Sequence, residues 1–187
     1  MIKNIGIVLN PTAGRGKAGR IFPQVLSMLH EVGIKTLVEI TELPGHGAEL
    51  AARLARKGVD AVVSAGGDGT LNEVLNGLAN LNFPVPMGAL GIGTGNDFLK
   101  SAGTAKDLLK QVEVIKQGNI KLLDLMRITY CDFGGKTAVR YSINDFGVGF
   151  PAKVSFRVNN MKGALKGAWS YAAAVITEIR LNKPVQL

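Results

Sequence analysis

The chemistry of this sequence centres on a run of three glycines around one carboxylate, placed directly after an apolar segment. The run reads Gly66-Gly67-Asp68-Gly69-Thr70. Glycines leave backbone N–H groups unshielded, so a phosphate can approach the main chain closely. A divalent cation is the usual bridge between a phosphate and a carboxylate in the same loop. The run therefore predicts a nucleotide polyphosphate bound with Mg²⁺, and phosphoryl transfer rather than hydride transfer.

A second run of small residues also ends in a carboxylate. It reads Gly93-Thr94-Gly95-Asn96-Asp97. Asn96 or Asp97 could simply cap a short helix over residues 98–101. Two glycine–aspartate loops at adjacent strand ends favour a shared site for Mg²⁺ or a substrate hydroxyl over two unrelated caps.

Four polar side chains in and beyond these loops have more than one interpretation. Thr70 and Glu73 have the spacing of a capping box, which predicts a structural role for both at the start of a helix. A ligand contact by Glu73 stays equally open, and Asn72 is a candidate to face the ligand. Asp124 lies in an apolar stretch and needs a partner, because burying an unpaired carboxylate is costly. A salt bridge and an active-site role stay equally open for Asp124.

Residues 10–17 form a third candidate phosphate loop, with glycines before a helix and two cationic side chains, Arg15 and Lys17. Its glycines also match the dinucleotide fingerprint G-x-G-x-x-G, with Glu39 about 20 residues further on. We interpret that match as coincidental. A dinucleotide fold has no need of a second glycine-rich loop with an aspartate, and here the first glycine follows the strand by several residues.

Apolar strands alternate with amphipathic helices over the first two-thirds of the chain. Strands are expected at residues 5–9, 35–40, 61–65 and 87–92, and helices at 18–32, 48–57, 70–78 and 105–117. This alternation predicts an α/β fold, an open parallel sheet with helices on both faces, as in Rossmann-like nucleotide-binding domains. Ligands of such sheets bind beyond the carboxyl ends of the strands. The loops that begin at Asn10, Thr41, Gly66 and Gly93 should therefore converge on one edge.

The pattern changes near Asp124. Extended segments at residues 121–130 and 136–143 flank turn residues, which predicts a hairpin. We assign residues 1–123 to the nucleotide-binding domain and residues 124–187 to the beginning of a β-rich second domain, apparently incomplete. A helix over residues 164–180 is expected to cover the new sheet, with membrane contact as the less favoured alternative.

Composition narrows the classes of partner and compartment. The 187 residues carry a net charge of +8, which favours an anionic partner, and much of the excess lies after residue 152. The single cysteine, Cys131, excludes an intrachain disulfide, and two histidines make a zinc site untenable. No apolar run approaches the ~20 residues of a spanning helix. We expect a cytoplasmic protein with at most a peripheral membrane role.

Together these residues resemble the diacylglycerol kinase catalytic domain family, particularly the bacterial soluble lipid kinases that are related to sphingosine kinases. The resemblance rests on Asn10-Pro11 with Gly14, on residues 66–74 and on residues 93–98. It continues in order and spacing through Asp124-Leu125 to Asn144 and Gly147-Val148-Gly149. Residues 66–70 alone are shared with NAD kinases and relatives of phosphofructokinase.

The resemblance implies ATP- and Mg²⁺-dependent transfer of the γ-phosphoryl group to a lipid hydroxyl, converting diacylglycerol to phosphatidic acid. The candidate nucleotide contacts are Asn10, Thr41, Gly66, Gly67, Asp68, Gly69, Thr70, Asn72, Glu73, Thr94, Gly95 and Asn96. The candidate catalytic cluster is Asp68, Asp97 and Asp124, with Asp68 as an indirect contact to the metal. The lipid would enter between the two domains, and the basic tail, including Lys162 and Lys166, would dock on anionic lipid.

Two alternatives stay open beside the lipid kinase. An NAD kinase-type enzyme would share residues 66–70, although the Asn10-Pro11 loop and residues 93–98 favour a lipid kinase. The second alternative is a nucleotide-binding module without turnover, because the resemblance places the general base and a structural Mg²⁺ site beyond Leu187. Nucleic acid is not an expected partner, and a homodimer stays open.

Overall fold

The structure is a computed structural model that describes residues 2–104, 107–132, 134–144, 146–161 and 168–181. The chain divides into two compact units, Met1–Asn144 and Asp145–Leu187. The division falls later in the chain than the domain boundary predicted near Asp124, and that boundary stays a prediction.

Four parallel strands form the sheet of the first unit, in the order β2-β1-β3-β4. They are β1 (Asn4–Leu9), β2 (Lys35–Ile40), β3 (Ala61–Gly66) and β4 (Met87–Gly91). β1 and β3 are central because their residues are almost all apolar or small and buried, whereas β2 is an exposed edge. After β1 the chain goes to one side for β2 and then crosses back for β3. The strand order therefore reverses between β1 and β3, where open α/β sheets bind ligands.

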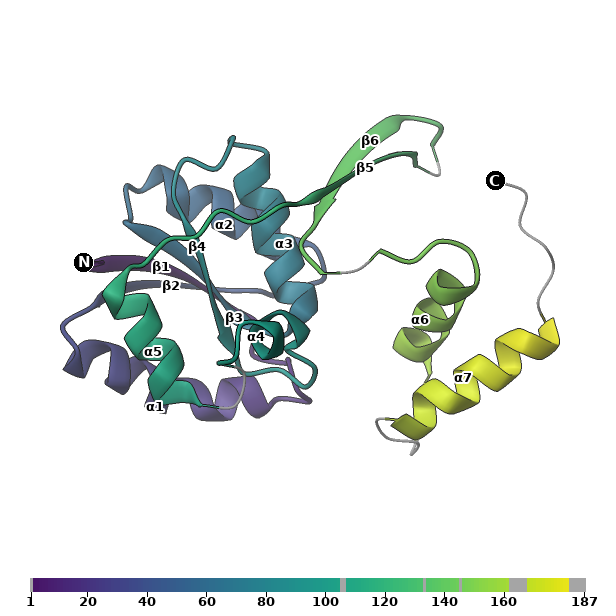
Figure 1. Cartoon of the computed structure of the whole chain (residues 1–187), viewed down its shortest axis with the longest axis horizontal. Coiled ribbons are helices and arrows are strands. Elements are labelled where there is room, and N and C mark those ends of the chain that lie inside the picture. Colours follow the sequence, from purple (N-terminus) through teal and green to yellow (C-terminus); the bar gives the residue numbers. More distant parts are fainter. Residues whose placement is uncertain (1, 105–106, 133, 145, 162–167, 182–187) are drawn as a thin grey trace. The chain divides into compact units, whose positions relative to one another are not determined.

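Helices cover both faces of this sheet (Figure 1). They are α1 (Lys17–Glu31) and α5 (Leu108–Gln117) on one face, and α2 (His46–Arg56) and α3 (Asp68–Ala79) on the other. Alternate residues of β1 divide between two cores, since Ile5 and Ile7 pack with α1 and α5, and Val8 packs with α2 and α3. The predicted α/β fold with helices on both faces is confirmed.

An antiparallel hairpin completes the first unit. It comprises β5 (Met126–Cys131) and β6 (Thr137–Ser142), with Met126 opposite Ser142. Asp132 begins the turn, and its carboxylate accepts hydrogen bonds from the backbone N–H groups of Gly134 and Lys136. The predicted hairpin is confirmed, and Figure 1 shows it extending from the region of α3.

The second unit contains a pair of helices, α6 (Phe150–Asn160) and α7 (Ala168–Leu181). An ion pair of 2.5 Å between Arg157 and Glu178 joins them. The sequence analysis assigned no helix to α6. α7 confirms part of the helix expected at residues 164–180, whose beginning lies outside the described residues. Of the helices that the structure describes, none combines the length and the apolar character needed to cross a bilayer.

Candidate functional site

The loops after the four parallel strands meet at the carboxyl edge of the sheet, as predicted. Three backbone hydrogen bonds connect them: Asn10 N–H to the Ala65 carbonyl at 2.9 Å, Thr41 N–H to the Leu9 carbonyl at 2.9 Å, and Gly93 N–H to the Gly66 carbonyl at 2.8 Å. The Asn10 side chain adds a fourth link, since its Nδ2 donates to the Thr70 hydroxyl at 3.2 Å. These contacts place the beginnings of all four loops at the same edge of the sheet.

Glycines make this convergence possible. A Cβ on Gly93 would lie 2.6 Å from Gly67 Cα, so only glycine lets the β3 and β4 loops come this close. Gly14 has a φ of +61° and also lies against the β4 loop, near Ile92. A Cβ on Gly69, in contrast, would meet no atom within 4 Å. The first turn of α3 is therefore open to a ligand at Gly69.

The N-terminus of α3 lies in the middle of this edge. Gly67 precedes the helix in an extended conformation, and no side chain caps the first turn. The N–H groups that begin a helix lack intrahelical acceptors and carry partial positive charge, so they favour an anion such as phosphate. α3 has the geometry that the glycine run predicted for a phosphate site.

The capping box predicted for Thr70 and Glu73 is wrong. The helix begins at Asp68, because the turn closes through a hydrogen bond from Leu71 N–H to the Gly67 carbonyl. Thr70 is therefore inside the helix and buried. Glu73 instead accepts hydrogen bonds from Gly45 N–H at 2.8 Å and Gly47 N–H at 2.9 Å, at the start of α2. Glu73 thus joins two helices, and its nucleotide contact stays a prediction.

The two oxygens of Asp68 have different surroundings. Oδ1 accepts hydrogen bonds from Asp97 N–H at 2.8 Å, Phe98 N–H at 3.4 Å and Asn144 Nδ2 at 3.2 Å. The first two belong to α4 (Asp97–Ser101), so this carboxylate holds the start of α4. Oδ2 accepts no hydrogen bond from any described residue and lies 2.8 Å from the position of a Cβ on Gly95. Oδ2 is therefore the oxygen left for a cation or ligand.

Asp97 is the second carboxylate at this edge. Its Oδ2 lies 3.7 Å from the same Cβ position on Gly95, and its Oδ1 pairs with Lys100 at 2.5 Å. Mg²⁺ in nucleotide sites usually takes one or two carboxylates together with phosphate oxygens and waters. No group of three metal-ligating acidic, histidine or cysteine side chains exists in the described part of the chain. The donor set fits a cation that arrives with phosphates rather than one held by protein alone.

Asp124 does not join this pair. It is exposed in the irregular segment before β5, two residues after Leu122, which is 99% exposed. The expectation that Asp124 is buried and therefore paired is wrong, because the apolar residues around it do not form a core here. The cluster of Asp68, Asp97 and Asp124 is not assembled, and a catalytic role for Asp124 stays a prediction.

Of the other residues predicted to contact the nucleotide, some stabilise the loops through hydrogen bonds and others are accessible to a ligand. Asn96 adopts the left-handed conformation, with a φ of 55°, and donates through Nδ2 to the carbonyls of Gly91 and Gly93 at 2.9 and 3.2 Å. Its Oδ1 is buried and has no partner in the described ranges. Asn72 accepts a hydrogen bond from Asn76 at 3.2 Å. Thr94 is exposed beside Gly95, so its hydroxyl is accessible to a ligand.

Glu39, the acidic residue of the dinucleotide fingerprint, is engaged elsewhere. It pairs with Lys57 at 2.9 Å and with Arg53 at 3.1 Å, both on α2. The hydrogen bond from Lys57 is the main cause that lowers the pKa of Glu39 below its ordinary value. These ion pairs agree with the interpretation of the fingerprint as coincidental.

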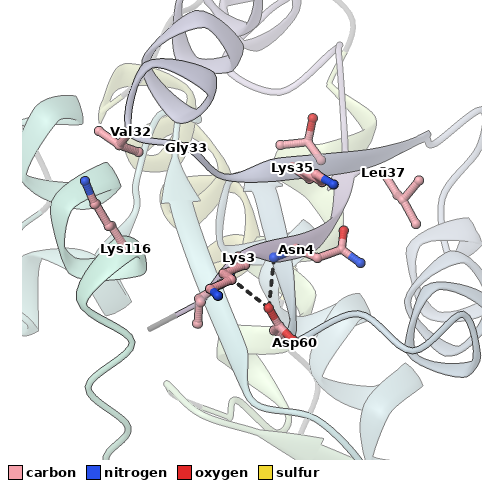
Figure 2. A pocket seen from close by; sticks show the side chains of 10 residues that line it. Lys3, Asn4, Val32, Gly33, Lys35, Leu37, Asp60 and Lys116 are labelled. Atoms are coloured by element: carbon pink, nitrogen blue, oxygen red, sulfur yellow. Dashed lines mark hydrogen bonds between the residues drawn. The ribbon is translucent and has the colours of Figure 1, made fainter.

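A separate hollow lies at the amino-terminal edge of the sheet (Figure 2). It has a volume of about 820 Å³, and Lys3, Lys35 and Lys116 are among its lining residues. Asp60 also lines it and accepts hydrogen bonds from Lys3 N–H at 2.8 Å and Asn4 N–H at 2.9 Å. Its lining residues include no helix start, and their one carboxylate, Asp60, is held by backbone N–H groups. We therefore place the candidate site at the carboxyl edge.

Comparison with protein families gives a match over residues 4–128 to the diacylglycerol kinase catalytic domain. A diacylglycerol kinase of Staphylococcus saprophyticus is 33% identical over 171 residues, which are 91% of this chain and 53% of the relative. A diacylglycerol kinase of Bacillus subtilis is 30% identical over 171 residues, 91% of this chain and 54% of its own length. The chain thus spans about half the length of these relatives.

Solved structures give the same similarity. The crystal structure of a diacylglycerol kinase from Bacillus anthracis str. Sterne matches with a TM-score of 0.57 and 28% identity, over 66% of this chain and 44% of its own. Another structure from the same organism matches with a TM-score of 0.59 and 27% identity, over 72% of this chain and 46% of its own. Sequence and fold therefore both show similarity to diacylglycerol kinases.

Proposed function

This chain belongs to the diacylglycerol kinase catalytic domain family, and from that premise we propose that it binds ATP with Mg²⁺ as the nucleotide-binding portion of a lipid kinase. The reaction of the whole protein would transfer the γ-phosphoryl group of ATP to a lipid hydroxyl. Diacylglycerol is the proposed acceptor, because the relatives carry the name diacylglycerol kinase.

One observation supports this proposal most strongly. The uncapped start of α3 and the free Oδ2 of Asp68 lie together where the loops of β1, β3 and β4 converge. Phosphoryl transfer needs mainly positioning of the phosphates and neutralisation of their charge. A helix N-terminus positions the phosphates through its backbone N–H groups. Carboxylates that hold a cation provide the neutralisation of phosphate charge.

Each residue at the edge has a proposed role within this site. The N–H groups of Gly69 and Thr70 would bind phosphate oxygens, and Asn10 would hold α3 in place through the Thr70 hydroxyl. Thr41 and Thr94 would contact the nucleotide from the neighbouring loops. Oδ2 of Asp68, with Asp97, would face Mg²⁺, which when bound neutralises phosphate charge.

A nucleotide-binding module without turnover is the second candidate. The observation in its favour is the uncapped start of α3, which can bind phosphate whether or not transfer follows. Binding of nucleotide without transfer to any acceptor would support it.

The lipid acceptor implies contact with a membrane surface. We propose that basic residues after residue 152 dock the protein on anionic lipid, by electrostatic attraction of about 1 kcal/mol per Lys or Arg near the surface. Lys162 and Lys166 lie outside the described residues. Replacing both with alanine should weaken binding to vesicles that contain anionic lipid, and unchanged binding would contradict the proposal.

The transfer of radiolabelled phosphate from ATP tests the function directly. Diacylglycerol in mixed micelles and NAD are offered separately to this chain and to a version extended beyond Leu187, with Asp68→Ala as the control. The proposal expects labelled phosphatidic acid from at least the extended version and none from the control. Labelled NADP without labelled lipid would replace the lipid kinase by an NAD kinase-type enzyme.

A further inference from the structure

The side chain of Asn76 on α3 forms two hydrogen bonds with the backbone of the hairpin. Asn76 of α3 donates through Nδ2 to the Tyr141 carbonyl at 2.9 Å and accepts at Oδ1 from Tyr141 N–H at 2.9 Å. A side-chain amide carries both a donor and an acceptor, so Asn76 pairs with β6 as a neighbouring strand would. The position of Tyr141 relative to α3 is therefore fixed in two directions.

A second contact joins the same segment to the beginning of α3. Asn144 follows β6 by two residues, and its Nδ2 donates to Oδ1 of Asp68 at 3.2 Å. Both asparagines are partly buried, which shields these hydrogen bonds from water. The end of β6 is thus tied to α3 at Asn76 and at Asp68.

We propose that Asn144 is a positioning residue, which turns the Asp68 carboxylate so that Oδ2 faces the cation of a bound Mg²⁺–nucleotide. The inference rests on the proposed function, because it concerns the same site. Asp97 N–H and Phe98 N–H both bind Oδ1 from the start of α4, so they limit the rotation of the carboxylate from one side only. The Asn144 donor approaches Oδ1 from a different element, after β6, and narrows that rotation further. Groups of this kind, which orient a ligand of a metal without touching the metal, strongly affect metal affinity.

The orientation of Asp68 also depends on the hairpin, because Asn76 holds β6 and Asn144 follows β6 in the chain. Loss of Asn76 should weaken the cation coupling in the same direction as loss of Asn144. In the double variant, the weakening of the cation coupling should be smaller than the sum of the two single effects, because Asn144 depends on the Asn76–Tyr141 contact for its position. A purely structural role for either residue would lower stability and leave the cation dependence unchanged.

Calorimetry of a non-hydrolysable ATP analogue, with Mg²⁺ titrated from zero, tests the inference on this chain. The variants are Asn144→Ala, Asn76→Ala, the double variant and Asn119→Ala, whose residue is exposed beside α5. Asn144→Ala should raise the Mg²⁺ concentration at half-maximal effect about tenfold, in the lower range for such orienting groups. Affinity for the analogue without Mg²⁺ should stay at the value of Asn119→Ala, whereas the unfolding temperature should fall slightly, because one partly buried hydrogen bond to a carboxylate is lost.

The outcomes separate this inference from the proposed function. A wild-type chain that binds the analogue with no Mg²⁺ dependence would overturn both. Normal Mg²⁺ dependence in the wild type and an equal midpoint in Asn144→Ala would overturn the inference alone. A shifted midpoint in Asn144→Ala, with no further shift in the double variant, supports it.

Discussion

Asp68 does two things with one side chain, because its oxygens are used separately. Oδ1 holds the start of α4 and Oδ2 faces the open edge beside Gly95. The residue therefore links the geometry of the loops to the charge of the site. Its two tasks can be separated by substitution.

Asp68→Asn keeps an oxygen for the α4 contacts but removes the charge. We expect it to lose about 100-fold in Mg²⁺-dependent nucleotide affinity, the upper end of the loss that follows mutation of groups that merely orient metal ligands. Its stability should stay close to that of the wild type. Asp68→Ala should lose the same affinity and also about 1 kcal/mol of stability, because the α4 N–H groups lose their acceptor. Calorimetry and urea unfolding measure the two effects, and wild-type Mg²⁺ dependence in Asp68→Asn would exclude Asp68 from the cation site.

Glu73 is a structural link between helices. Glu73→Ala should lower the free energy of unfolding by about 1–2 kcal/mol, because two N–H groups at the start of α2 lose a charged acceptor. Urea unfolding provides the measurement. Glu113→Ala, an exposed position on α5, is the control and should stay within about 0.5 kcal/mol of the wild type. Equal stability of the two variants would show that the contact contributes nothing.

At the scale of elements, the loops differ in what their glycines do. Position 93 requires glycine because another loop lies against it, whereas a Cβ on Gly69 would face open space. This difference predicts opposite behaviour for the same substitution at the two positions.

Gly93→Ala should destabilise the protein by about 1–3 kcal/mol, the usual cost of overpacking. Gly69→Ala should be neutral or stabilising by up to about 1 kcal/mol, because alanine favours the helix and clashes with nothing. Gly69→Ala should nevertheless weaken nucleotide binding about tenfold, the equivalent of one lost hydrogen bond to a charged group. Thermal unfolding and calorimetry test both variants. Unchanged nucleotide affinity in Gly69→Ala would move the phosphates away from α3.

The amino-terminal edge is predicted to contribute stability that depends on pH. Hydrogen bonds from Lys3 N–H and Asn4 N–H lower the pKa of Asp60 below its ordinary value of 3.8. A lowered pKa means that folding favours the charged form, so the stabilisation is present above pH 3.8 and is lost as pH falls through the lowered pKa. Asp60→Asn should therefore be less stable than the wild type at pH 7, and the difference should shrink in acid. A difference that stays constant from neutral pH to pH 3 would contradict this cause.

At the scale of the whole molecule, the sheet was predictable and the long-range polar contacts were not. Strand and helix periods are local patterns, so the alternation identified the sheet, and the rule for parallel strands predicted where its loops meet. The contacts of Glu73 with Gly47 and of Asn144 with Asp68 span 26 and 76 positions. No local sequence pattern identifies partners that are so far apart along the chain. Glu73 also had a plausible local partner in Thr70, which made the wrong interpretation attractive.

The missed helix α6 and the wrongly predicted burial of Asp124 have a different cause, because their local signals were ambiguous. Val154, Phe156 and Val158 alternate with polar residues, a period typical of strands, yet they lie in a helix. The apolar residues around Asp124 suggested burial, but the structure leaves them exposed. Apolar residues predict a core only where other elements cover them.

The central claim is that the carboxyl edge of the sheet binds the Mg²⁺–nucleotide. Amide hydrogen exchange of this chain, with and without Mg²⁺ and a non-hydrolysable ATP analogue, tests it most directly. The account predicts slower exchange in residues 10–17, 66–72 and 93–98, and no change around the hollow of Lys3, Lys35 and Lys116. Slower exchange at that hollow, with unchanged exchange in the three loops, would contradict the account.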